Sequence, residues 1–140
     1  MKRLWVILPV LLIVGCSKDL DTLQDRDGIY FGINSEKPFS GSVNKKYQSG
    51  QIELKGIITN GKKDGFWTEW YENGQKESEG TYKDGKEDGL WTDWYKDGQK
   101  AMERTYKDGK RISTKCWSWN GIECAECGSN YFEGWKCWDN

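Results

Sequence analysis

Histidine is absent from this 140-residue chain. Its absence removes the commonest general base of enzymes and the Ser-His and Cys-His pairs that activate nucleophiles. The glycines fall at turn spacing, and none belongs to the strand-to-helix loop that cradles a phosphate. The many acidic residues alternate with lysines, which is typical of a solvated surface. We therefore predict a protein with no catalytic activity, no cofactor and no bound metal.

Aliphatic residues are scarce beyond residue 15. The hydrophobic fraction of the chain is 36%, yet it contains nine Trp and seven Tyr. Any core must therefore be built largely from aromatic rings. Without the first fifteen residues, 19 basic side chains stand against 22 acidic ones, which gives a net charge of −3. This weak and mixed charge argues against a nucleic-acid partner.

The first fifteen residues form a unit of their own. Lys2 and Arg3 give a positive start, and an apolar run follows over residues 4–14. This run is shorter than the roughly 20 residues that a membrane-spanning helix needs. Its length and flanks are typical of a signal peptide, so we expect residues 1–15 to be removed on export.

The end of this segment, Leu12-Ile13-Val14-Gly15-Cys16, resembles the lipobox of bacterial lipoproteins. The resemblance implies cleavage between Gly15 and Cys16, lipid on the Cys16 thiol and acylation of the new amino terminus. It implies a place in the bacterial cell envelope with the lipid in a membrane, and Ser17 favours the outer membrane of a Gram-negative host. An uncleaved anchor and a plain secretory signal are the alternatives. Residues 16–25 are polar and are predicted to form a tether.

The chain repeats itself with a period of 24 residues. Residues 64–87 and 88–111 are identical at sixteen of the 24 positions. An older copy over residues 40–63 keeps Gly41, Tyr47, Gly50, Gln51, Glu53, Gly56, Gly61 and Lys62 in register with the later copies. The last copy departs from the one before it by carrying Ala101 and Arg104 in place of Glu77 and Gly80. Such a repeat indicates one structural unit used several times.

Each copy is predicted to form two strands and two turns. Residues 66–72 are rich in β-formers, and Asn73-Gly74 supplies the positive φ angles of a tight hairpin turn. Residues 75–83 then run back to a second turn signal at Asp84-Gly85. A helix is a poor alternative, because each of the frequent glycines would cost about 1 kcal/mol in a helix interior.

The aromatic residues of each copy predict a sheet with rings on both faces. Side chains alternate across a strand, so Trp67 shares one face with Tyr71, while Phe66 shares the other with Trp70. Because both faces carry rings mixed with charge, a packed sandwich is disfavoured. We therefore predict an all-β fold, a single-layered twisted antiparallel β-meander of about three hairpin repeats over residues 26–115. Cross-strand ring pairs worth roughly 0.2–1 kcal/mol each would hold it together.

A recognisable set of residues recurs within the copies: Trp70-Tyr71, Gly74-Gln75-Lys76, Gly80, Tyr82, Gly85-Lys86, Asp88-Gly89 and Trp91. This pattern resembles the bacterial MORN-variant repeat, the type found in antitoxin proteins of the YwqK class. The lead-in at residues 26–31 and 38–41 is also similar. The resemblance implies a MORN-like meander of stacked hairpins and a non-catalytic binding role. A lipid anchor argues against a cytosolic antitoxin, because an exported chain cannot meet a cytosolic toxin.

The last quarter of the chain, residues 116–140, is rich in cysteine: Cys116, Cys124, Cys127 and Cys137. An even number in an exported chain predicts two disulfides, here in a small cap over the open end of the sheet. Because Cys116 and Cys124 bracket a turn signal at residues 119–121, we favour pairing Cys116 with Cys124 and Cys127 with Cys137. A four-thiolate zinc site and a redox-active Cys-x-x-Cys are the alternatives.

Three functions fit these features. The first is a protein-binding or scaffold module at the cell envelope, with contact residues Trp67, Trp70, Tyr71, Trp91, Trp94 and Tyr95, because Trp and Tyr dominate binding hot spots. For each of these rings, the competing interpretation is that it simply holds the sheet together. The second function is binding to a cell-wall or surface glycan, which regularly spaced rings beside acids would suit. The third, an envelope immunity or antitoxin-like role, follows from the family resemblance alone.

Overall fold

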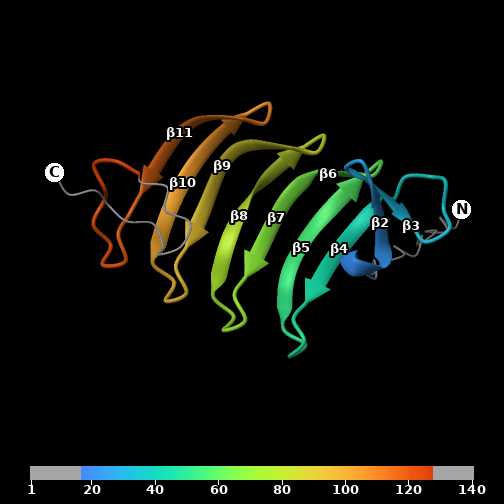
Figure 1. Cartoon of the computed structure of the whole chain (residues 1–140), viewed down its shortest axis with the longest axis horizontal. Coiled ribbons are helices and arrows are strands. Elements are labelled where there is room, and N and C mark those ends of the chain that lie inside the picture. The colour runs from blue at the N-terminus through green and yellow to red at the C-terminus, as the bar shows by residue number, and fades with distance from the viewer. Residues whose placement is uncertain (1–16, 128–140) are drawn as a thin grey trace, which may run out of the picture.

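A computed structural model describes residues 17–127, and these residues form an all-β protein (Figure 1). The first elements are β1 (Lys18–Asp19), the short 3-10 helix η1 (Leu20–Thr22), β2 (Leu23–Arg26), β3 (Ile29–Gly32), β4 (Gly41–Lys46) and β5 (Ile52–Thr59). The others are β6 (Lys62–Lys63), β7 (Gly65–Trp70), β8 (Lys76–Lys83), β9 (Lys86–Trp94), β10 (Lys100–Lys107) and β11 (Lys110–Cys116). No helical segment among residues 17–127 has the length and apolarity to cross a membrane.

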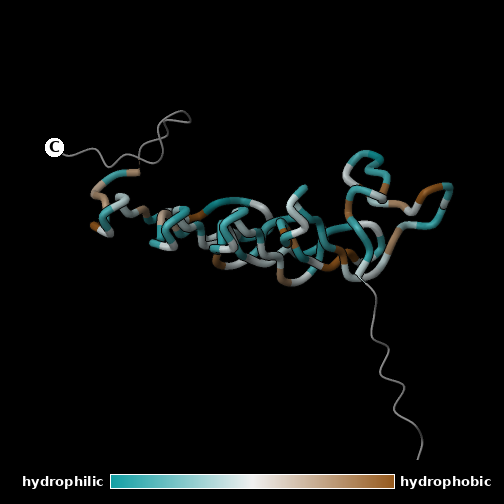
Figure 2. The backbone as a smooth tube through the Cα atoms, turned by 90° about the horizontal axis from the view of Figure 1, so that it is seen from below, coloured by the Kyte–Doolittle hydropathy of each residue, from teal (hydrophilic) through white to brown (hydrophobic). Residues whose placement is uncertain are grey.

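One large sheet dominates the molecule, with strand order β1-β4-β5-β7-β8-β9-β10-β11 and β6 paired to β5. Its pairings are antiparallel, except that β1 runs parallel to β4. Seen along its edge, the sheet is a thin band, and the β2–β3 hairpin stands on one side of it (Figure 2). The predicted β-meander of hairpin repeats is therefore confirmed.

The two long edges of the sheet carry different turns. At one edge Asp84 and Gly85 both adopt positive φ (51° and 84°), as a two-residue type I′ turn requires. At the other edge only Gly74 does, with φ 83°. There the Tyr71 N–H donates to the Gln75 carbonyl (2.9 Å), which closes a three-residue turn with a glycine bulge. The predicted pair of positive φ angles at Asn73-Gly74 is thus wrong, because the Asn73 side chain instead accepts a hydrogen bond from the Gln75 N–H (3.0 Å).

One face of the sheet, which we call the packed face, carries the core: Val43, Leu54, Ile58, Trp67, Trp91 and Tyr106. Its two indoles lie against glycines of the neighbouring strands. A Cβ atom added at Gly56 would lie 2.2 Å from Cδ2 of Trp67, and one added at Gly80 would lie 2.2 Å from Cδ2 of Trp91. The Tyr82 ring stands edge-on between the two indoles, with centroids at 5.8 and 5.0 Å. The repeat therefore requires a glycine at this position, because any larger residue would overlap the tryptophan ring.

The N-terminal segment covers the packed face at one end of the sheet (Figure 1). Leu20, Leu23 and Tyr30 pack against the core, and the Tyr30 N–H donates to the Gly61 carbonyl (2.7 Å). The structure differs here from the polar tether predicted for residues 16–25, because residues 18–25 form β1, η1 and most of β2. The two leucines explain the difference, since they bury apolar surface that a free tether would expose to water.

The opposite side, which we call the open face, presents Ile57, Phe66 and Leu90 together with the rings of Trp70 and Trp94. Strand alternation from Ser42, Thr68 and Thr92 places these side chains there. Ile57, Phe66 and Leu90 are 46%, 56% and 55% exposed. The described residues thus leave a row of apolar side chains in solvent on one face only of this sheet.

The cysteines pair differently from the favoured prediction. Cys116 is bonded to Cys127, with Cα atoms 5.8 Å apart. Cys124 is disulfide-bonded as well, and Cys137 lies outside the described residues. The hairpin that suggested the Cys116–Cys124 pair does form, because the Cys124 N–H donates to the Cys116 carbonyl (2.8 Å). The turn was therefore predicted correctly, but the backbone pairing of Cys116 with Cys124 does not decide which thiols are joined.

Candidate binding surfaces

The six rings proposed as contact residues fall into three groups. Trp67 and Trp91 are 1% and 5% exposed. Their indole N–H groups donate to the backbone carbonyls of Ile57 and Thr81, each at 3.1 Å. Both rings therefore belong to the packing of the sheet, which leaves them no open ring face for a partner.

Tyr71 and Tyr95 form the second group, and each joins one repeat to the next. The Tyr71 hydroxyl donates to the Trp94 carbonyl (2.8 Å), and the Tyr95 hydroxyl donates to the Trp117 carbonyl (2.7 Å). Tyr47 makes the same bond to the Trp70 carbonyl one repeat earlier (2.6 Å). Burial is the largest reason why the pKa of each of the three phenols is raised. The tyrosines fix the spacing of the repeats and keep their ring edges partly exposed on the packed face.

Between these two tyrosines the packed face is hollowed. The hollow has a volume of about 440 Å³ and is lined by Glu69, Tyr71, Glu77, Ser78, Asp93, Trp94, Tyr95, Ala101 and Arg104. Burial, and secondly the charge of Glu69, raises the pKa of Glu77. None of the four ion pairs among residues 17–127 includes Glu69 or Glu77. The floor of the hollow is therefore acidic. Glu69 and Glu77 form no ion pair in the described part of the chain, although the charge of Lys96 partly offsets the rise in the pKa of Glu77.

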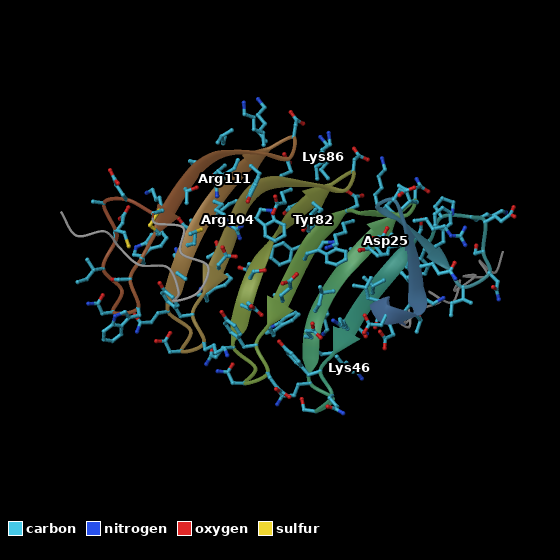
Figure 3. All side chains as sticks on the ribbon, in the orientation of Figure 1. Asp25, Lys46, Tyr82, Lys86, Arg104 and Arg111 are labelled. Atoms are coloured by element: carbon cyan, nitrogen blue, oxygen red, sulfur yellow. A yellow bond between two sulfur atoms is a disulfide. The ribbon has the colours of Figure 1, made fainter. Side chains whose placement is uncertain are left out.

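One side of the hollow is closed by a well-ordered ion pair. A terminal guanidinium nitrogen of Arg104 lies 2.7 and 2.6 Å from the two carboxylate oxygens of Asp93. Burial raises the pKa of Asp93 in spite of this cation. Arg104 also donates to the Tyr106 hydroxyl (3.3 Å), and its buried Nε has no partner among the described atoms. Figure 3 shows Arg104 on the same face as Tyr82, whose pKa burial raises to about 12.

Trp70 and Trp94 form the third group, on the open face. A lysine ammonium lies over each ring, Lys55 over Trp70 at 6.0 Å and Lys76 over Trp94 at 5.5 Å from the ring centroid. The same arrangement recurs with Lys100 over Trp117 at 5.0 Å. Lysines standing over the rings hinder a sugar from stacking there, which weakens the glycan hypothesis.

The sequence reasoning did not name Glu69, Glu77, Asp93 or Arg104 as site residues. A signal for two of them, Glu77 and Arg104, was present, because the last copy has Ala101 and Arg104 where the previous copy has Glu77 and Gly80. The sequence gives no indication that Glu69 and Asp93 belong to a site, since an acid that alternates with aromatic residues along a strand is ordinarily expected to face solvent. Three acids from neighbouring strands meet only once the register of the sheet is known.

The structure holds no arrangement for metal chemistry in the part of the chain that it describes. Among residues 17–127 no three His, Cys, Asp or Glu side chains are grouped closely enough to hold a metal ion. The Cys116–Cys127 disulfide occupies two of the thiols that the zinc alternative would need. Cys16 and Cys137 lie outside the described residues.

A family model described as the MORN repeat variant matches residues 63–84 and 87–108. The chain contains MORN-variant repeats. No curated protein and no solved structure matches the chain. The matched ranges contain Gly80 and Trp91, which lie against each other, and Trp67, whose glycine partner Gly56 belongs to the preceding copy. Residues 40–62 lie outside the match, yet the Tyr47–Gln51 turn has the same hydrogen bonds as the Tyr71–Gln75 turn, so this turn geometry recurs in all three copies.

MORN-variant repeats typically serve as binding or scaffold modules and are usually non-catalytic. The geometry of this chain agrees with that use. Its repeats are joined by side chain to backbone hydrogen bonds, and its hollow presents carboxylates and tyrosine rings. A rigid sheet with such a hollow can recognise a cationic surface without reacting with it.

Proposed function

We propose that this chain is a lipid-anchored protein of the bacterial cell envelope whose MORN-variant sheet binds a protein partner. The anchoring rests on Cys16 and on the signal-like segment before it. The binding rests on one observation, the acidic hollow of the packed face between Tyr71 and Tyr95. Aromatic rings and an excess of negative charge together favour a partner that inserts a basic side chain.

Lysine or arginine from a partner would suit this hollow for electrostatic reasons. The pKa of Glu77 is raised because its charge is partly desolvated and repelled by Glu69. A cation placed between the two carboxylates would relieve that repulsion and lower the pKa of Glu77. The tyrosine rings beside them would add contact area at little cost in conformational entropy.

Capture from native envelopes tests the binding. We expect the lipidated protein to retain a partner that is lost on Glu77→Lys, which reverses the charge in the hollow. Glu79→Lys is the matched control, because it makes the same change on the same strand but faces the other side of the sheet. Equal capture by both variants would refute binding through the hollow.

The anchor is tested separately by Cys16→Ala. We expect this variant to lose lipid and the cleavage that precedes Cys16, as measured by intact mass, while the circular dichroism of the repeat sheet is unchanged. A Cys16→Ala chain that still carries lipid would contradict the anchoring. Two acyl chains or more would be needed for stable attachment, because a single chain binds only marginally.

A further inference from the structure

The open face differs from the packed face in carrying large apolar side chains that are exposed to solvent. Ile57 on β5 lies beside Phe66 on β7, and Leu90 lies on β9 with Thr81 of β8 between it and Phe66. We call Ile57, Phe66 and Leu90 the apolar row, and each of them is roughly half exposed. Exposed apolar side chains that line up on one face indicate a contact surface more strongly than scattered ones do. The repeat itself generates the row, since Phe66 and Leu90 occupy the same position in successive copies.

Tryptophan and lysine flank this row on the same face. Trp70, Trp94 and Trp117 each carry a lysine ammonium within 6.0 Å of the ring centroid. Two of these lysines are also paired with glutamates, Lys76 with Glu79 and Lys100 with Glu103. Lysines nevertheless outnumber acids on the strands of this face. The register places there Lys46, Lys55, Lys62, Lys76, Lys83, Lys86, Lys100, Lys107, Lys110 and Lys115, against Asp19, Glu79, Asp88 and Glu103. Apolar rows edged by Trp and Lys suit the boundary between lipid and water.

The first described residue reaches the sheet on this face. Asn44 on β4 donates a hydrogen bond from its side chain to the Ser17 hydroxyl, and Lys18 pairs with Val43. Ser17 lines an open hollow of about 480 Å³ together with Ile57, Phe66 and Trp70. Ser17 therefore lies at the border of the apolar row, and in sequence it directly follows Cys16.

We propose that the open face lies flat against the lipid surface that holds Cys16. The proposal rests on the lipid anchoring put forward above, and it adds the orientation of the anchored domain. Ile57, Phe66 and Leu90 contact the acyl boundary, while the lysines meet anionic headgroups. The acidic hollow of the packed face then points away from the membrane, where a partner can reach it.

The charge of the open face disfavours a second copy as its occupant. Two open faces packed against each other would bring lysine-rich strands together, and like charges that face each other repel. A membrane with anionic headgroups supplies the opposite sign. The lipid anchor also keeps that surface within a few residues of the sheet, which raises its effective concentration at the open face.

Lysine footprinting of the lipidated protein tests the orientation. The protein is placed in vesicles of phosphatidylethanolamine and phosphatidylglycerol or in detergent micelles, and a water-soluble acetylating reagent is added. We expect Lys55, Lys76 and Lys100 to react about fivefold more slowly in vesicles than in micelles, since a bound lipid surface excludes the reagent. Lys45 serves as the internal reference, because it lies on the packed face and is paired with Glu53.

Two matched variants sharpen the result. Lys76→Glu and Lys45→Glu make the same charge change, each at a lysine paired with a glutamate, on opposite faces of the sheet. We expect Lys76→Glu combined with Leu90→Asp to abolish the protection of Lys55 and Lys100, and Lys45→Glu to leave it intact. Both proteins must retain the disulfide and the far-ultraviolet spectrum of the wild type.

The outcomes distinguish a failure of the proposed orientation from a failure of the lipid anchoring at Cys16. Lipid on Cys16 with equal acetylation of the two faces overturns the orientation and leaves the anchoring in place. Absence of lipid on Cys16 overturns both. Protection of the open face that grows with protein concentration in micelles indicates contact between copies and also overturns the orientation.

Discussion

The last two repeats are nearly the same in sequence, yet they make different contacts with the strand that follows them. At the end of residues 64–87, Gly80 lies under the indole of Trp91. At the corresponding place in residues 88–111, Arg104 stands opposite Thr114. The first arrangement receives another repeat, whereas the second ends the series. The position of Gly80 and Arg104 therefore distinguishes the internal repeat from the terminal one.

The residues beside that position change with it. Glu77 and Ser78 of the internal repeat are half-buried and polar. Their counterparts Ala101 and Met102 are 2% and 1% exposed, and Met102 pairs with Cys116 of β11. The terminal repeat thus packs apolar groups against the disulfide, while the internal repeat leaves an acidic hollow. Two copies of one repeat unit thus serve different purposes: one forms the acidic hollow, and the other ends the series of repeats.

The largest effect should come from adding a methyl group at Gly80. We expect Gly80→Ala to lower the free energy of unfolding by about 3 kcal/mol, because its Cβ would overlap the Trp91 ring and force it to move. Arg104→Ala places a methyl group at the equivalent site without any indole above it, so any cost there should come from the lost ion pair with Asp93 and not from a clash. Chemical denaturation followed by circular dichroism measures both.

A double-mutant cycle shows whether the indole is the cause. In a Trp91→Leu background the Gly80→Ala change should cost under about 1 kcal/mol, since the clashing ring is gone. An undiminished cost would mean that Gly80 is needed for its backbone conformation instead. In that case the indole contact would not be what distinguishes the internal repeat from the terminal one.

The ion pair of the terminal repeat gives the second effect. We expect Arg104→Ala to cost about 2 kcal/mol, because it leaves the Asp93 carboxylate half-buried without its charged hydrogen bonds. The pKa of Asp93, already raised by burial, should rise further, so the variant should regain stability as the pH falls. Adding Asp93→Asn should recover part of the loss at neutral pH. A variant equally destabilised at all pH values would contradict the role of Asp93.

Much of the fold was predictable from local sequence. The alternation of Phe66, Thr68 and Trp70 against Trp67 and Glu69 indicates strands, and each Asp-Gly or Asn-Gly pair marks a turn. The 24-residue period then fixes the order of hairpins, because each unit needs its neighbours to bury the tryptophan. These signals are local in the chain, so they can be recognised without knowing how the strands pair.

The features that escaped prediction depend on bulges. Because Gly80 lies against Trp91, the 24-residue period predicts that Arg104 lies against Lys115. The strand pairing instead puts Thr114 opposite Arg104. The β10–β11 pair has one irregularity between Thr105 and Tyr106, with Ile112 as its extra residue. A bulge moves every later side chain relative to its neighbour. The acidic hollow and the disulfide both lie beyond such irregularities, which spacing in sequence does not reveal.

The smallest effect concerns the acidic hollow of the internal repeat. Glu77 ordinarily titrates near 4.5, and burial together with Glu69 raises its pKa in the folded state. The folded protein therefore binds this proton more tightly than the unfolded chain does, so the contribution of Glu77 to stability is most favourable below pH 4.5 and declines as the pH rises through its folded pKa.

Replacing this carboxylate by an amide should therefore stabilise the protein at neutral pH. We expect Glu77→Gln to raise the free energy of unfolding by roughly 0.5 kcal/mol at pH 7, a small value because the group is partly exposed to solvent. The gain should vanish near pH 4, where the wild-type carboxyl is itself protonated. Glu72→Gln, in an exposed turn, should change nothing. Stabilisation at pH 7 with weaker capture of the partner would mean that Glu77 is kept for binding at the expense of stability, whereas destabilisation would show that the carboxylate has a structural partner.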